Sequence, residues 1–192
     1  TGRAFEQIRM AALDGWPILY VGAGGGYCYG PAGPSHHAPD DLALMGLIPG
    51  MTVLCPGSPS EVAALLPQAL ALPGPCYLRV GRFGEPEFDT YDNYVKLGIP
   101  RWISMDDSGV MLLSLGETTA GASRVTGCSH CHFHTLKPFV TSEWLSDVFG
   151  GSIEYPEVVV VEETTPLGGL FAAAMEWMHG LRPYGPRCVT RV

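Results

Sequence analysis

Two adjacent histidines, His36 and His37, carry the clearest chemical signal in the sequence. They lie in a segment rich in glycine and proline that follows a short apolar run at residues 17–21. An imidazole titrates near neutral pH, so it can donate or accept a proton during a reaction. The alternative is a pair of loop histidines that only hydrogen-bond the backbone, and the spacing alone favours that alternative.

Two arginines follow a later apolar run and are expected near the same edge of the fold. Arg79 lies within the apolar run at residues 76–80, and Arg82 follows shortly after the run ends. A guanidinium can bind a phosphate or a carboxylate through two parallel hydrogen bonds. Equally, either arginine could cap a linker or contact another subunit. Side chains alternate along a strand, so the two arginines need not act together.

A cluster of cysteines and histidines has the spacing of a metal or haem site. Cys128 and Cys131 are followed by His132 and His134, and C-x-x-C-H is the haem-attachment spacing. Zinc would need a second ligand pair, which the two histidines could supply. Haem attachment requires export, and no export signal is visible. We therefore predict that this segment is a buried strand.

The apolar pattern predicts an α/β fold with two lobes. In the first part, strands at residues 17–21, 51–55 and 76–80 alternate with helices at residues 4–13, 40–47 and 60–72. In the second part, strands are expected at residues 110–115, 132–136, 158–162 and 188–192, and helices at residues 142–149 and 168–179. Short crossovers through helices force parallel pairing of strands. The predicted domains are residues 1–88 and 108–192, joined by a linker at residues 89–107.

Composition excludes several classes of partner. The chain has 192 residues, of which 46% are hydrophobic and 16% are charged, a composition typical of a globular protein. Its net charge of −8 argues against nucleic acid or an anionic membrane surface as a partner. No apolar run is long enough to span a bilayer, and nothing at the start resembles a signal peptide. The chain begins with Thr1 inside an expected helix, which suggests a trimmed N-terminus. Six scattered cysteines indicate reduced thiols in a cytoplasmic protein.

Five sequence segments occur in an order and spacing that resemble the transketolase family along nearly the whole chain. They are RAFEQIR, GPSHHAPDDLALMGLIPGMTV with CPGSPSEV, PCYLRVGR, HTLKPF and VVVVEETTPLGGLFAA. The segments are most similar to the small, separately encoded C-terminal subunits of split bacterial transketolases. The resemblance implies the latter part of a thiamine-diphosphate pyrimidine-binding domain, a parallel sheet with flanking helices, followed by a transketolase C-terminal α/β domain.

The same resemblance implies an enzyme that transfers a two-carbon ketol unit between sugar-like substrates with thiamine diphosphate and Mg²⁺. A separate N-terminal subunit would hold the diphosphate and the metal, in a dimer of heterodimers. The glutamate that activates the cofactor would lie upstream of Thr1. Within this chain, Arg3 and Glu6 match positions that line the cofactor pocket, and His36 matches the catalytic histidine that faces the substrate. His37, Arg79 and Arg82 are the predicted substrate-binding residues.

The sequence departs from the family pattern in three places. Ala32 replaces an acidic residue that reads a sugar hydroxyl, and residues 24–26 are glycines where relatives have polar or basic residues. These glycines could form an anion-binding nest or only a turn. The stretch at residues 116–134 is short, so a helix has been lost or residues are missing. Glu162 and Glu163 could form an acid/base pair, but the resemblance places them far from the cofactor and favours packing or subunit contact.

Three other functions remain open at this point. One is a deoxyxylulose-phosphate synthase, and another is the β subunit of a 2-oxoacid dehydrogenase. The histidine segment differs from the wording of both. The third is a non-catalytic partner subunit that has kept the fold without the chemistry.

Overall fold

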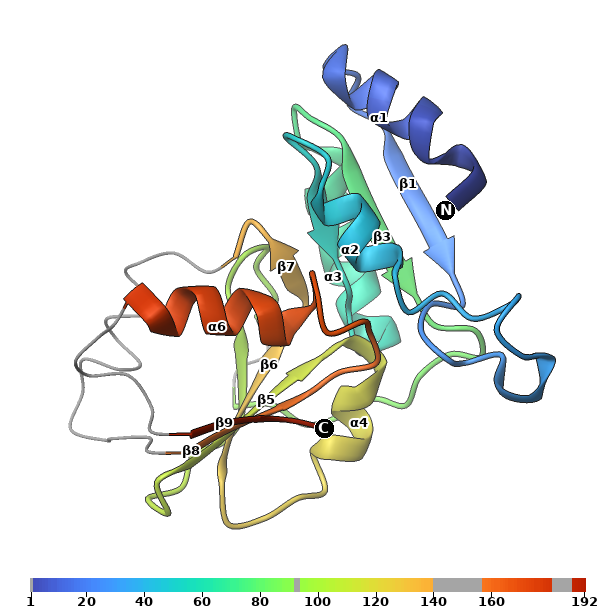
Figure 1. The fold of residues 1–192 in the computed structure, drawn as a ribbon. Coiled ribbons are helices and arrows are strands. Elements are labelled where there is room, and N and C mark those ends of the chain that lie inside the picture. Colours follow the sequence, from blue (N-terminus) through green and yellow to red (C-terminus); the bar gives the residue numbers. More distant parts are fainter. Residues whose placement is uncertain (1, 92–93, 140–156, 181–187) are drawn as a thin grey trace.

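The computed structural model describes residues 2–91, 94–139, 157–180 and 188–192. Within these residues the chain forms two sheets with helices packed around them (Figure 1). The first lobe comprises η1 Gly2–Ala4, α1 Phe5–Leu13, β1 Leu19–Ala23, η2 Gly30–Ala32, α2 Asp41–Gly46, β2 Thr52–Leu54, α3 Pro59–Leu70 and β3 Cys76–Val80. The second lobe comprises β4 Arg101–Ser104, β5 Val110–Leu115, η3 Gly116–Thr118, α4 Thr119–Ala122, β6 Ser129–Phe133, β7 Thr135–Lys137, β8 Glu157–Val161, α6 Leu170–Gly180 and β9 Cys188–Arg191.

The first sheet has the strand order β1-β3-β2-β7. Strands β1, β3 and β2 are parallel, as the alternation of helices and strands predicts. Strand β7 belongs to the second half of the sequence, yet it pairs antiparallel with β2. The first sheet is therefore completed by a strand from the second lobe.

The second sheet has the order β4-β6-β5-β8-β9. Strands β6, β5, β8 and β9 are parallel, and β4 is antiparallel to β6 at the edge. Strand β4 lies inside the segment predicted to be a linker, so that part of the segment is integrated into the second lobe. The side chain of Trp102 in β4 packs against the core, which explains the pairing. The helix predicted at residues 142–149 lies outside the described residues.

The strand predicted at residues 132–136 is in fact divided between the two sheets. Strand β6 ends at Phe133, and β7 begins at Thr135. His134 therefore lies at the crossing point between the lobes. Upstream of β6, the short stretch that follows β5 forms only η3 and the four-residue helix α4. These two short helical segments and residues 123–128 connect β5 to β6, which run parallel.

One apolar core extends through both lobes. Its buried side chains include Leu42, Met45 and Val53 from the first lobe and Leu113, Phe133, Val158 and Leu170 from the second. Burial of shared apolar surface is the main force that holds two such lobes together. Among the described helices, none combines the length and apolar character needed to cross a bilayer.

Candidate active site

The two histidines lie in a loop between β1 and α2, which we call the histidine loop, residues 26–38. Its ends are joined by reciprocal backbone bonds, in which Gly26 N–H donates to Ala38 O at 3.0 Å and Ala38 N–H donates to Gly26 O at 2.9 Å. Gly30 and Gly33 have φ of 44° and 82°, a conformation that side chains rarely allow. The glycines therefore let the loop fold back on itself beyond the carboxyl end of β1 (Figure 1).

His36 and His37 differ in their surroundings. His36 is exposed, and its Nδ1 lies 3.0 Å from Oγ of Ser35. His37 is half-buried, with Nε2 donating to the carbonyl of Gly30 at 2.9 Å and its ring edge-on to Tyr27. His37 therefore stabilises the loop through the backbone, whereas the ring of His36 is accessible from solvent.

The glycines before the loop form a turn. Gly24 N–H donates to Val80 O at 2.9 Å, and Gly26 N–H donates to Ala38 O. These two amides are used within the chain and are not free to bind an anion. The structure thus favours the turn over the anion-binding nest. Ala32 lies on η2 and is exposed.

Arg82 lies beside the histidine loop. Its guanidinium carbon is 4.3 Å from the ring centroid of Tyr29 and 4.5 Å from that of Phe83. The same Tyr29 ring has its centroid 6.1 Å from that of His36. The structure therefore makes Arg82 and His36 neighbours of one aromatic ring, and both side chains are exposed.

Arg79, by contrast, is buried and held by carboxylates of the chain itself. Its guanidinium is 2.5 Å from Glu117 and 3.5 Å from Asp41, and it donates to the carbonyl of Glu163 at 3.2 Å. Only 1% of the residue is exposed, so a substrate has no direct access to it here. Burial raises the pKa of Asp41, although Arg79 and the hydroxyl of Tyr77 act in the opposite direction. Arg79 joins β3 of the first lobe to η3 and the β8–α6 connection of the second.

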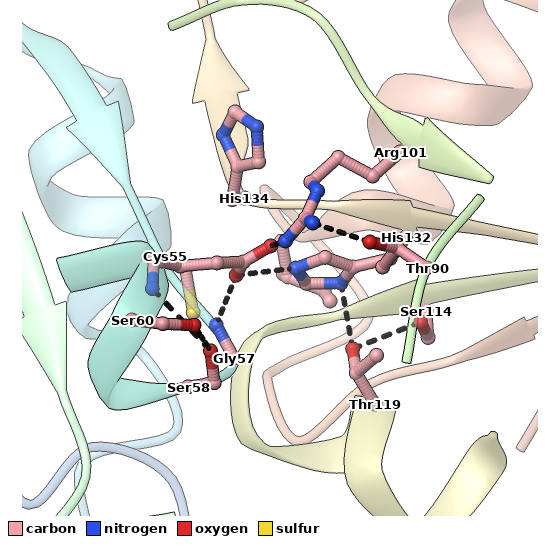
Figure 2. Close-up of polar contacts among 12 residues, drawn as sticks. Cys55, Gly57, Ser58, Ser60, Thr90, Arg101, Ser114, Thr119, His132 and His134 are labelled. Atoms are coloured by element: carbon pink, nitrogen blue, oxygen red, sulfur yellow. Dashed lines mark hydrogen bonds and ion pairs between the residues drawn. The ribbon is translucent and has the colours of Figure 1, made fainter. Parts of the chain in front are cut away.

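A second buried cluster joins the lobes at Glu61, His132 and Arg101. Ser58 caps α3 by accepting from Glu61 N–H, and the Glu61 carboxylate reaches back to Gly57 N–H at 2.8 Å. This is a capping arrangement, S-x-x-E, readable in the sequence. The carboxylate also lies 2.8 Å from Nε2 of His132 and 2.8 Å from Nη1 of Arg101. Figure 2 shows His132 and Arg101 converging on this point.

Burial would raise the pKa of Glu61, but the charge and hydrogen bond of His132, with smaller contributions from His134 and the Gly57 amide, lower it to about 2. The carboxylate is therefore ionised at neutral pH. Because its oxygens are all occupied by internal partners, this cluster serves to join the lobes and is not exposed to a substrate.

The cysteine and histidine segment is a core strand, as predicted. All residues of β6 are buried. Nδ1 of His132 lies 2.7 Å from Thr119 Oγ1, and Nε2 of His130 lies 2.8 Å from Ser114 Oγ. Burial and the neighbouring His132 lower the pKa of His130 to about 4, and the same causes lower the pKa of His134 to about 4. Across the described part of the chain, no three His, Cys, Asp or Glu side chains form a metal-binding group.

Arg3 is on η1 and Glu6 in the first turn of α1, and both are exposed. Among the described residues, neither forms a hydrogen bond or ion pair with His36 or Arg82.

The two glutamates at the end of β8 have separate tasks. Glu162 caps α6 by accepting from Leu170 N–H at 2.6 Å and pairs with Arg191 at 3.0 Å, which is the packing role predicted for it. Glu163 instead accepts from Tyr27 N–H at 2.6 Å, inside the histidine loop. Sequence analysis missed this contact because the two residues are 136 positions apart and no local pattern links them.

Comparison with known proteins shows what the chain is similar to. The transketolase pyrimidine-binding domain family matches residues 1–83. The subunit SqwH of 6-deoxy-6-sulfo-D-fructose transketolase from Clostridium sp. strain MSTE9 is 28% identical over 183 residues, which cover 91% of this chain and 55% of that relative. Residues 1–83 belong to the transketolase pyrimidine-binding domain family. An apulose-4-phosphate transketolase subunit from Phocaeicola vulgatus is 26% identical, covering 91% of the chain and 57% of the relative.

Solved transketolase structures have a similar fold. A split-gene transketolase, described as an inactive β4 tetramer, aligns with a TM-score of 0.79 and 26% identity, covering 100% of this chain and 62% of that one. A transketolase from Pichia stipitis shares the fold, with a TM-score of 0.74 at 18% identity over 87% of this chain and 26% of that one. The chain spans a little over half the length of the curated subunits that it matches.

Proposed function

We propose that this chain is the C-terminal section of a two-component transketolase-like enzyme that transfers a two-carbon ketol unit between sugar-like substrates. The observation that carries the proposal is the placement of His36 at the carboxyl end of the first sheet, where open α/β sheets bind ligands. His36 is exposed in a loop whose ends are fixed by backbone bonds. An accessible imidazole held in this way can transfer protons to and from substrate hydroxyl groups.

The three predicted substrate-binding residues differ in how directly each could contact a substrate. Arg82 is exposed beside Tyr29, so it is the arginine best placed to bind an anionic group of a substrate. His37 holds the loop through Gly30 and presents its ring edge beside Tyr27. For Arg79 we propose an indirect role, because its guanidinium is buried against Asp41 and Glu117.

We propose that Arg3 and Glu6 contribute to a thiamine diphosphate site. Arg3 and Glu6 are exposed at the start of α1, as expected of residues that line a pocket shared with other parts of the enzyme. When bound, thiamine diphosphate supplies the electron sink that allows the bond beside a ketose carbonyl to be cleaved. We propose that a partner subunit holds the diphosphate and Mg²⁺ in a dimer of heterodimers. The six free cysteines support an intracellular, cytoplasmic enzyme.

Reconstitution tests the proposal. The full natural chain is mixed with its purified N-terminal partner, thiamine diphosphate and Mg²⁺, and ketol transfer from several ketoses is measured. We expect transfer that requires both chains. His36→Ala should reduce turnover by about 10²–10⁴-fold. The control His130→Ala changes a buried side chain and should leave turnover per folded molecule far less affected. Equal losses in the two variants would refute the assignment of His36.

A second candidate function has one observation in its favour. The 1-deoxy-D-xylulose-5-phosphate synthase of Chlorobaculum tepidum is 26% identical over 98% of this chain, although the match covers only 30% of that enzyme. The same reconstituted complex is therefore assayed with pyruvate as the donor. Decarboxylation of pyruvate without any ketol transfer would favour the synthase reaction. Absence of both reactions and of cofactor binding would favour a non-catalytic partner subunit.

A further inference from the structure

Two residues of the second lobe hold the two ends of the histidine loop. Oε1 of Glu163 accepts from Tyr27 N–H at 2.6 Å, at the start of the loop. The N–H of Thr165 donates to Pro39 O at 2.8 Å, immediately after the loop ends. Both contacts come from the connection between β8 and α6, and they flank the backbone bonds that join Gly26 and Ala38.

Close packing reinforces these contacts. A Cβ atom on Gly26 would lie 2.7 Å from Cδ of Glu163, so glycine is needed for the loop to approach the carboxylate. The carbonyl of Glu163 is in turn fixed by the buried Arg79, which donates to it at 3.2 Å. Glu163, which contacts the loop, is therefore itself held in place by Arg79 at the junction between the lobes.

The hydrogen bond between Glu163 and Tyr27 is linked to His37 through the ring of Tyr27. The Tyr27 residue that donates to Glu163 also packs its ring edge-on against His37, with centroids 5.2 Å apart. His37 then hydrogen-bonds Gly30 O across the loop. His37 also acts electrostatically on Glu163, where it opposes the rise in pKa caused by burial. A displacement of Glu163 would therefore move Tyr27 and, through it, His37 and the adjacent His36.

We propose that Glu163 of the second lobe is a positioning residue for the histidine loop, so that the C-terminal lobe sets the geometry of His36. This inference rests on the proposed function only for its effect on turnover. The position of the loop itself is a property of the protein without substrate. The paired contacts at Tyr27 and Pro39 make the β8–α6 connection a clamp on both ends of the loop.

Amide hydrogen exchange in the full natural chain with its partner subunit tests the clamp. Glu163→Ala should accelerate exchange at Tyr27 and Ala38 by about tenfold or more, because a charge-assisted hydrogen bond is lost. Glu163→Gln should restore protection, since its amide oxygen still accepts from Tyr27 N–H. The matched control is Glu176→Ala, which removes an exposed carboxylate of the same lobe and should leave the loop unchanged.

Exchange at Leu113 in β5 shows whether the whole lobe has loosened. If Glu163→Ala loses protection at Leu113 as well, the clamp is tested with Glu163→Asp instead. Aspartate keeps the negative charge, but its shorter side chain places the carboxylate farther from Tyr27 N–H. Faster exchange confined to the loop in that variant would support the clamp. Unchanged loop exchange in a folded Glu163→Ala or Glu163→Asp protein would overturn it.

Turnover separates positioning from simple stability. We expect Glu163→Ala to lower kcat about ten- to a hundredfold with little change in KM, because a misplaced catalytic group slows the chemical step. Glu163→Gln should recover most of kcat. Unchanged kcat alongside a loosened loop would overturn the positioning of His36. If the wild-type complex shows no ketol transfer, the proposed function fails, whereas hydrogen exchange still decides the clamp.

Discussion

Nε2 of His132 lies 2.8 Å from Oε2 of Glu61, and this bond connects α3 of the first lobe with β6 of the second. The other oxygen of the same carboxylate accepts from Arg101 of β4 at 2.8 Å. Glu61 and His132 are fully buried. One carboxylate therefore satisfies groups from two strands of the second sheet while capping a helix of the first lobe.

Loss of the Glu61 carboxylate should be strongly destabilising. We expect Glu61→Ala to lower the free energy of unfolding by about 3–5 kcal/mol, since it leaves the buried Arg101 guanidinium without this partner. Urea denaturation of the full chain measures the change. The control Glu176→Ala, on an exposed face of α6, should change stability by less than about 0.5 kcal/mol. Similar values for both variants would mean that the apolar core alone joins the lobes.

Acid should destabilise the protein through its buried histidines. The pKa values of His130 and His134 are lowered from 6.5 to about 4 by burial and by His132. Between these values the unfolded chain binds more protons than the folded one, so stability falls as pH decreases. Each histidine contributes a slope of up to about 1.4 kcal/mol per pH unit. Below the ordinary pKa of 4.5, protonation of Glu61 in the unfolded chain adds a further loss that continues towards pH 2.

Urea midpoints measured from neutral pH down to about pH 4 test this dependence. His130→Asn should lower stability at neutral pH and flatten the slope, because one of the two buried imidazoles is gone. His36→Asn is the control, because it removes an exposed imidazole and no buried one. A wild-type stability that is flat across this range would contradict the prediction.

The local parts of this fold were readable from the sequence. The bounds of β3 and β5 agree with their apolar runs, because a buried parallel strand needs a continuous stretch of apolar residues. The exposed histidine loop followed from its glycines and prolines. The buried partners of Arg79 did not, because Asp41, Glu117 and Glu163 lie on separate elements and meet only when both lobes pack. A charged side chain at the end of a strand gives no local sign of whether it faces solvent or a carboxylate from a distant segment.

Gly25 lies so close to Arg79 that any side chain at this position should destabilise the protein. A Cβ at this position would overlap Nε of Arg79 and lie 2.6 Å from its Cδ. Because the arginine is buried and ion-paired, it has little freedom to move aside. We expect Gly25→Ala to lower the free energy of unfolding by about 1–3 kcal/mol.

A second glycine supplies the comparison. Gly46 ends α2, and a Cβ there would meet no atom within 4 Å. Gly46→Ala should therefore be neutral or stabilising by up to about 1 kcal/mol, as expected for a helical glycine with open space. Thermal or urea unfolding of both variants measures the difference. Equal free energies of unfolding for the two alanine variants would show that the Arg79 side chain moves aside without a measurable cost.

Arg82 should determine the affinity for anionic substrates. Its guanidinium carbon lies 4.3 Å from the ring centroid of Tyr29 and 4.5 Å from that of Phe83, and the residue is exposed. With phosphorylated or sulfonated ketoses, we expect Arg82→Ala to raise KM about tenfold or more and to change kcat less, since a uniform binding interaction is lost. Arg82→Lys should recover only part of the affinity, because lysine cannot bind an anion through a planar fork. Arg124→Ala removes an exposed arginine of the second lobe and should leave KM unchanged. If neutral and anionic ketoses lose affinity equally in Arg82→Ala, the residue supports the loop through Tyr29 instead of binding the anion.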